Sequence, residues 1–130
     1  MSDSSNLVQR IYAAFGEGNI AFILDQLADD VSWDDELAPC GVPWLTHRKG
    51  REEVASFFQS LEQLAFHQFE PLQVLEGEGC VACVVRVDLE VVATGKRIRD
   101  LAMHLWHFDN GKVTSFRHFV DTHQHVLALT

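Results

Sequence analysis

The sequence predicts an α+β domain in which three helices precede a run of long antiparallel strands. Apolar residues recur at helical spacing up to Leu64, and beyond that point they follow the alternation of strands. Helices followed by strands, rather than alternating with them, are typical of α+β folds. The chain has 130 residues and no repeats, linkers or low-complexity segments. It is therefore expected to form one domain, residues 1–130.

Two helices are expected before the first strand. Gly16 and Gly18 end the first helix, and the side chain of Asn19 is suited to cap the second. The apolar face consists of Leu7, Val8, Ile11, Tyr12 and Phe15 in the first helix, and of Ile20, Ile23, Leu24 and Leu27 in the second.

A short strand, an irregular segment and a third helix follow. Alternation over residues 31–36 predicts the strand, whereas prolines and a glycine interrupt residues 37–49, which could act as a flap. Residues 50–64 predict a helix with Glu52 and Glu53 in its first turn, where the helix dipole favours negative charge. Its apolar face consists of Val54, Phe57, Phe58, Leu61 and Leu64.

Four strands make up most of the second half. They are expected at residues 66–75, 81–92, 97–108 and 113–121, with glycine-containing turns between them. The residues from 122 onward are expected to be a frayed tail.

The composition argues against several classes of partner. A net charge of −9 repels phosphate backbones, so nucleic acid is not expected. There is no apolar run of roughly 18 residues, so no membrane partner is expected. The polar first residues lack a secretory pattern, and three cysteines without disulfide spacing indicate a reducing, cytoplasmic location.

No cofactor and no metal are predicted. The chain lacks a glycine-rich loop that could cradle a phosphate. Cys80 and Cys83 would point to opposite faces of a strand, so they cannot readily share a metal. His123 and His125 have the spacing of a ligand pair, but no third ligand stands out.

Ionisable residues are concentrated in the otherwise apolar last third of the chain. They are Arg86, Asp88, Asp100, His104, His107, Arg117, His118 and Asp121. Burial of such groups is costly unless they are paired, and proteins build proton-transfer sites from arranged clusters of them. They either line a pocket or surround the surface.

Six segments carry a family resemblance through their order and spacing. They are Val8-Gln9-Arg10 with Ala13-Ala14, Leu27-Ala28-Asp29-Asp30-Val31, Gly50-Arg51-Glu52-Glu53-Val54, Thr94-Gly95-Lys96, Asp109-Asn110-Gly111-Lys112-Val113 and Phe119-Val120-Asp121. Together they resemble the SnoaL-like and ketosteroid isomerase-like branch of the nuclear transport factor 2-like superfamily. The resemblance implies a cone-shaped domain, in which helices close over a strongly curved sheet around an apolar cavity. It also implies a homodimer, here expected through the outer sheet face. The fold hosts isomerases, cyclases, hydrolases and non-enzymes, so it leaves the activity open.

The ketosteroid isomerase pattern implies a general base at Asp35. This residue shares a strand face with Trp33, so partial burial beside an aromatic ring is expected. The oxyanion donors of that pattern would be a helix tyrosine, where this chain has Ile11 followed by Tyr12, and an acid whose position corresponds to His104. The alternative is that Asp35 is a solvated carboxylate.

The epoxide-hydrolase pattern implies an arrangement of Arg86, Asp88 and Asp121. Its water-holding tyrosine and asparagine correspond to Ser32 and Asp34, so that part is missing. The alternative is a purely structural arginine–aspartate pair.

The polyketide cyclase pattern implies Asp121 as the acid/base, with His104 donating to the developing oxyanion. It is the preferred catalytic hypothesis because it demands the fewest groups. Only the resemblance selects His104, since both faces of its strand are apolar. The alternative is that Asp121 caps or pairs with Arg117, four residues before it. Asp121 and His118 would both face inward only if the strand contained a bulge.

Aromatic residues are expected to wall a cavity for a small, mainly apolar organic molecule. The expected ligand contacts are Tyr12, Phe15, Trp33, Phe57, Phe58, Trp106 and His118. In this hypothesis Asp121 or Asp35 is the base, His104 is the donor, and Arg86 with Asp88 orient the ligand. The competing class is a non-catalytic ligand-binding or interaction module with the same fold.

Overall fold

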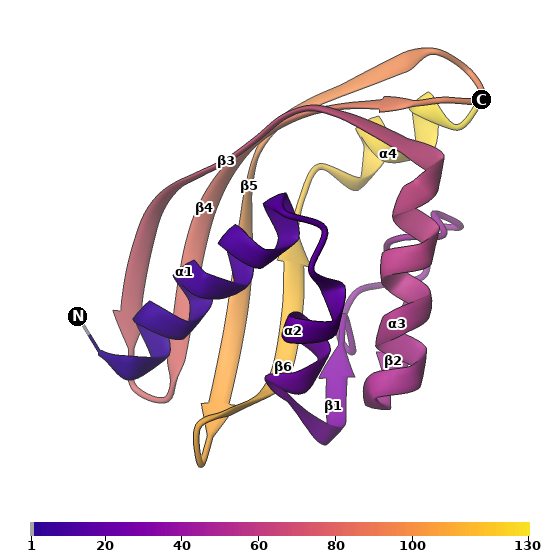
Figure 1. The fold of residues 1–130 in the computed structure, drawn as a ribbon. Helices are drawn as coiled ribbons and strands as arrows, with labels where there is room; N and C mark the ends of the chain where they lie inside the picture. The colour runs from indigo at the N-terminus through magenta and orange to yellow at the C-terminus, as the bar shows by residue number, and fades with distance from the viewer. Residues whose placement is uncertain (1) are drawn as a thin grey trace.

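The computed structural model describes residues 2–130 as a bent sheet with three helices on its inner side and a fourth at its end (Figure 1). The helices are α1 (Asp3–Gly16), α2 (Ile20–Asp25), α3 (Gly50–Ser60) and α4 (Thr122–Ala128), with a 3-10 turn η1 (Leu61–Gln63). The strands are β1 (Leu27–Trp33), β2 (Arg48–Lys49), β3 (Leu64–Gly77), β4 (Cys80–Val91), β5 (Lys96–Asp109) and β6 (Lys112–Phe119). The α+β class expected from the sequence is confirmed.

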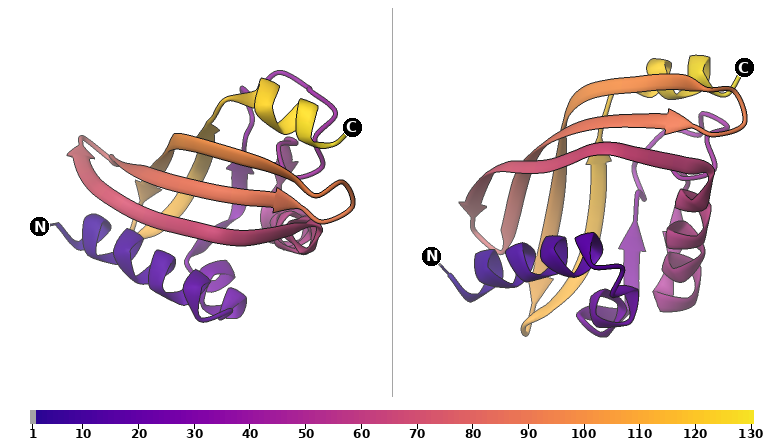
Figure 2. Two further views of the ribbon diagram at one scale, coloured as in Figure 1. Left: turned by 90° about the horizontal axis from the view of Figure 1, so that it is seen from above. Right: turned by 45° about the horizontal axis from the view of Figure 1, so that its top comes forward.

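The described strands form one sheet in the order β2-β1-β6-β5-β4-β3. Neighbouring strands are antiparallel except β1 and β6, which run parallel. β3, β4 and β5 arch over, and α1, α2 and α3 lie on the inner side of the bend (Figure 2). The arrangement leaves the interior between the helices and the inner face of β4, β5 and β6.

Local sequence accounts for the helix ends. The Ser2 hydroxyl accepts a hydrogen bond from the Ser5 backbone nitrogen, and the Asn19 side chain accepts one from that of Phe22, so both α1 and α2 are capped. Gly18, between the two helices, has a φ of +74° that other residues rarely adopt. The buried face of α1 includes Val8 and Ile11.

The register of β5 and β6 brings two histidines together. His104 lies directly opposite His118, and Trp106 lies directly opposite Phe116. Directly opposed residues on antiparallel strands point to the same face. These side chains are shielded from solvent, so the structure identifies the inner faces of both strands, which periodicity alone could not do.

The C-terminal residues differ from the expected frayed tail. Asp121 is the N-cap of α4, where its side chain accepts hydrogen bonds from the Gln124 backbone and side chain. α4 packs against β5 and buries His125 and Ala128. The helix was missed because it is short and its buried face includes a histidine. None of the described helices is long and apolar enough to cross a membrane.

Candidate functional site

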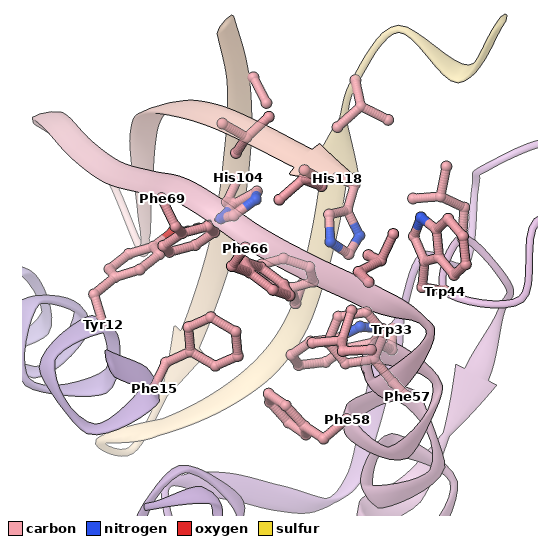
Figure 3. Close-up of a pocket in the computed structure, with 18 of the residues that line it drawn as sticks. Tyr12, Phe15, Trp33, Trp44, Phe57, Phe58, Phe66, Phe69, His104 and His118 are labelled. Carbon is pink, nitrogen blue, oxygen red and sulfur yellow. Dashed lines mark hydrogen bonds between the residues drawn. The ribbon is translucent and has the colours of Figure 1, made fainter. Parts of the chain in front are cut away.

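The candidate site is an apolar cavity between the helices and the inner sheet face (Figure 3). Its volume is about 90 Å³. Judged by the volume that one buried water needs, this space holds on the order of six to nine water-sized groups. The cavity wall includes all seven residues expected to contact a ligand: Tyr12, Phe15, Trp33, Phe57, Phe58, Trp106 and His118. As it stands, the cavity matches a ligand built on a single small ring.

Asp34 is the buried acid of the site. It follows β1 with a φ of +55°, a left-handed conformation that aspartate tolerates better than most residues, and its backbone nitrogen donates to the Phe116 carbonyl at 2.8 Å. Its side chain is fully buried. The two carboxylate oxygens bind His118, one at the backbone nitrogen and the other at Nδ1, each at 2.8 Å.

This contact sets the proton position on His118. A carboxylate is an acceptor, so it holds the His118 proton on Nδ1. When Nδ1 alone carries a proton, the lone pair of the ring lies on Nε2, and the His118 ring belongs to the cavity wall. His118 therefore offers an acceptor for a proton, and Asp34 stabilises the imidazolium that would result.

A chain of two hydrogen bonds holds His104 in the opposite tautomer to His118. Trp106 Nε1 donates to the Tyr12 hydroxyl at 3.1 Å, and the Tyr12 oxygen lies 2.7 Å from His104 Nδ1. An indole N–H can only donate, and the Cys83 thiol, which also contacts the Tyr12 hydroxyl, is a weak acceptor. His104 Nδ1 is the stronger acceptor, so the single hydroxyl proton is directed to it. Burial raises the pKa of Tyr12 well above its usual value, so the phenol keeps this proton. The His104 proton is accordingly on Nε2.

The His104 ring is also kept neutral. Burial, and secondarily the neighbouring His118, hold the pKa of His104 well below its usual value. The rings of His104 and His118 lie 5.1 Å apart between centroids and are nearly perpendicular, at 85°. The cavity thus presents an Nε2–H donor beside an Nε2 acceptor on adjacent strands.

Asp35 does not take the interior position expected for it. Its side chain is 63% exposed and pairs with His47 Nε2 at 3.2 Å. The left-handed turn at Asp34 interrupts the strand alternation, so the carboxylate one residue earlier enters the core instead. Asp35 is therefore the solvated carboxylate that the alternative reading described.

Arg86, Asp88 and Asp121 also lie away from the cavity. Arg86 and Asp88 project to the outer face of β4, where Asp88 pairs with Arg97 at 2.7 Å. The hydrogen bonds that Asp121 makes as the cap of α4 lower its pKa, with Gln124 as the main cause. The epoxide-hydrolase arrangement is therefore not assembled, and neither is the pairing of Asp121 with His104.

The sequence reasoning missed two ionisable residues in or beside the cavity wall, Asp34 and His125. The signal for Asp34 was the pair of consecutive aspartates after Trp33. Consecutive residues of a strand point to opposite faces, so one of the two was expected to point inward. His125 gave no such signal because a buried α4 was not expected. Within residues 2–130, no cluster of three or more His, Cys, Asp or Glu side chains is arranged to hold a metal ion.

Comparison with known structures places the fold in a large group. A nuclear transport factor 2-like protein from Burkholderia thailandensis superposes with a TM-score of 0.86 at 23% identity, covering 100% of this chain and 99% of the other. A candidate SnoaL-like polyketide cyclase from Mesorhizobium loti gives 0.73 at 19%, covering 92% and 99%. TerC co-crystallised with polyporic acid gives 0.82 at 20%, covering 98% of each chain.

The sequence itself matches one family. No match among curated proteins is significant. The SnoaL-like domain family matches residues 8–116, which include most of α1, all of β4 and most of β6. The chain therefore belongs to the SnoaL-like family of the nuclear transport factor 2-like superfamily.

Proposed function

We propose that this protein binds a small, mainly apolar carbonyl compound and catalyses proton transfer on it, as an isomerase or cyclase. One observation carries the proposal: two adjacent histidines have their ring protons on opposite nitrogens, fixed by Asp34 on one side and Tyr12 on the other. One ring supplies a base and the other a hydrogen-bond donor, which are the two groups that enolate chemistry needs.

The reaction begins at the carbon beside the carbonyl. His118 Nε2 takes a proton from this carbon, and the electron pair of the C–H bond forms the enolate. His104 Nε2–H donates to the enolate oxygen, while Asp34 compensates the positive charge on His118. In an isomerisation, His118 returns the proton to a different carbon. In a cyclisation, the enolate carbon attacks a second carbonyl, and the proton goes to the new alkoxide.

The surroundings support a small organic ligand. The cavity wall is dominated by aromatic and aliphatic side chains, which excludes water and strengthens the few polar contacts. The names of two fold relatives agree with this class, since one is a candidate polyketide cyclase and the other was co-crystallised with polyporic acid. Binding without catalysis is the competing function and requires the same cavity.

The test uses cyclohex-3-enone, a single-ring ketone whose double bond moves into conjugation when a proton is transferred. The gain in ultraviolet absorbance follows the reaction. We expect acceleration by the wild-type protein and a loss of about 10²- to 10⁴-fold in His118→Phe, with Asp35→Asn unchanged. Equal rates in wild type and His118→Phe would refute the catalytic role, and saturable binding without turnover would favour the binding module.

We also propose that the partner is a second copy of this chain. Four exposed apolar residues lie on the outer face of the sheet and are here called the outer-face patch: Leu75, Leu101, Met103 and Phe119. Met103 and Phe119 are directly opposed across β5 and β6, so the patch is continuous there. Exposed apolar surface of this kind favours protein association.

A further inference from the structure

α4 places a third histidine in the cavity wall, apart from the pair on β5 and β6. His125 lines the cavity and is only 3% exposed. Its partner is Trp44, in the irregular segment between β1 and β2, whose indole Nε1 donates to His125 Nδ1 at 2.9 Å. Neither residue takes part in the proton transfer proposed above.

The contact with Trp44 determines what His125 can offer a ligand. Because the indole N–H only donates, Nδ1 is an acceptor and the proton of the neutral ring lies on Nε2. Burial is the main cause that lowers the pKa of His125 to about 4, so the ring is neutral near pH 7. Nε2 is buried and has no hydrogen-bond partner among the described residues.

An unpartnered buried N–H is unfavourable, and proteins leave few of them. Trp33 Nε1, in the same wall, is a second buried N–H without a partner among residues 2–130. Together with His104, the described residues of the cavity wall therefore carry more unpartnered hydrogen-bond donors than acceptors. A ligand that complements it carries more than one acceptor oxygen.

Charge limits the kind of oxygen. Asp34 is buried beside His118, and the carboxylates of Asp100 and Asp121 act electrostatically on His125. Additional negative charge on the ligand would be repelled by these groups. The complementary group is consequently a neutral carbonyl or ether oxygen.

We propose that His125 Nε2–H forms a second oxygen-binding subsite, so that the ligand is a small ring with two neutral acceptor oxygens. This inference rests on the proposed function, because it assigns the carbonyl that reacts to His104 and His118. Trp44 is a positioning residue that fixes the His125 tautomer. The substrate class is then a cyclic diketone or an alkoxyketone.

The subsite is tested by the preference for a second oxygen. Binding is measured by calorimetry for cyclohexanone and for two neutral diones: cyclohexane-1,4-dione and 2,2-dimethylcyclohexane-1,3-dione, whose methyl groups prevent it from forming the acidic enol. We expect wild type to bind at least one dione about 5- to 10-fold more tightly than cyclohexanone, the gain of one hydrogen bond. His125→Phe should lose this preference and keep its affinity for cyclohexanone, while His123→Phe, an exposed position on the same helix, should keep both.

A second measurement uses the unmodified protein, so the test does not depend on the folding of a variant. The ¹⁵N–¹H signal of His125 Nε2–H should shift when the preferred dione is added and stay in place with cyclohexanone. A folded His125→Phe protein that retains the preference, or a wild type with none, would overturn the subsite alone. If neither ketone binds wild type, the proposed function fails with it.

Discussion

The carboxylate of Asp34 lies directly against the His118 ring and binds both the backbone nitrogen and Nδ1 of that residue at 2.8 Å. One contact fixes where β6 sits relative to the end of β1, and the other fixes the tautomer of the ring. The acid is thus both a structural link between two strands and the electrostatic partner of the proposed base.

Asp34→Asn tests this double role. The amide keeps the shape and can still bind the backbone nitrogen, but it lacks the charge that stabilises a protonated His118. We expect enone isomerisation to slow by about 10²-fold or more, measured from initial rates, with a cooperative fold retained. Asp35→Asn is the matched control, since that carboxylate is exposed. Unchanged turnover in Asp34→Asn would remove Asp34 from the mechanism.

Tyr12→Phe tests the hydrogen-bond chain to His104. The substitution leaves Trp106 Nε1 without its acceptor in a residue that is only 3% exposed. The free energy of unfolding should fall by about 1–3 kcal/mol, the cost of an unsatisfied buried group, as measured by urea denaturation.

The double variant Tyr12→Phe/Trp106→Phe separates this cost from lost packing. Once Trp106 is replaced, the absence of the Tyr12 hydroxyl leaves no indole N–H unpaired. The double variant should therefore lose less free energy of unfolding than the two single variants lose together. Strict additivity would mean that the Trp106–Tyr12 hydrogen bond contributes nothing.

Hydrophobic periodicity was sufficient to predict the fold class. Helices bury residues at a helical spacing, whereas strands bury alternate residues, so the two patterns can be told apart in the sequence. The ends of α1 and α2 and the turns between the long strands agree with the caps and glycines in the sequence. α4 was not predicted, because its only cap signal was Asp121, which had been assigned a catalytic role. A single acidic residue can serve either purpose, and only tertiary contacts decide between them.

The site was predicted in outline and misassigned in detail. Aromatic residues on α1 and α3 lie in the cavity wall as their periodicity indicated. The buried acid was expected one residue too late, at Asp35, because strand alternation carries no sign of the positive φ at Asp34. His104 and His118 lie opposite each other because of the register between β5 and β6. This register could not be predicted from the sequence of either strand alone.

Met103→Glu tests the outer-face patch as a homodimer interface. A charge at its centre, next to Phe119, would be costly to desolvate in an apolar interface. We expect the wild type to sediment as a dimer and this variant as a monomer. Leu127→Glu, an exposed apolar position on α4 outside the patch, should remain dimeric. A wild type that sediments as a monomer at tens of micromolar would rule out this assembly.

Buried histidines should make the fold sensitive to acid. The pKa of His125 is lowered to about 4 by burial and by His118, against the opposing effects of Asp100 and Asp121. Above the ordinary histidine value of about 6.5, both the folded and unfolded states are neutral at this residue. Between about 6.5 and 4 the unfolded chain binds a proton that folded His125 does not, so the free energy of unfolding decreases as pH falls. His104, whose pKa is also lowered, acts in the same direction.

His125→Phe isolates the contribution of His125 to the loss of stability in acid. Between about pH 7 and pH 4.5, wild type should lose on the order of 2–3 kcal/mol more of its free energy of unfolding than the variant. Urea denaturation at both pH values measures the difference. Val126→Phe, which adds a ring on the same helix and removes no titratable group, should lose as much as wild type. Equal losses in wild type and His125→Phe would mean that His125 is free to take up a proton in the folded protein. The ring would then not be held neutral, and the tautomer required for its Nε2–H would not be fixed.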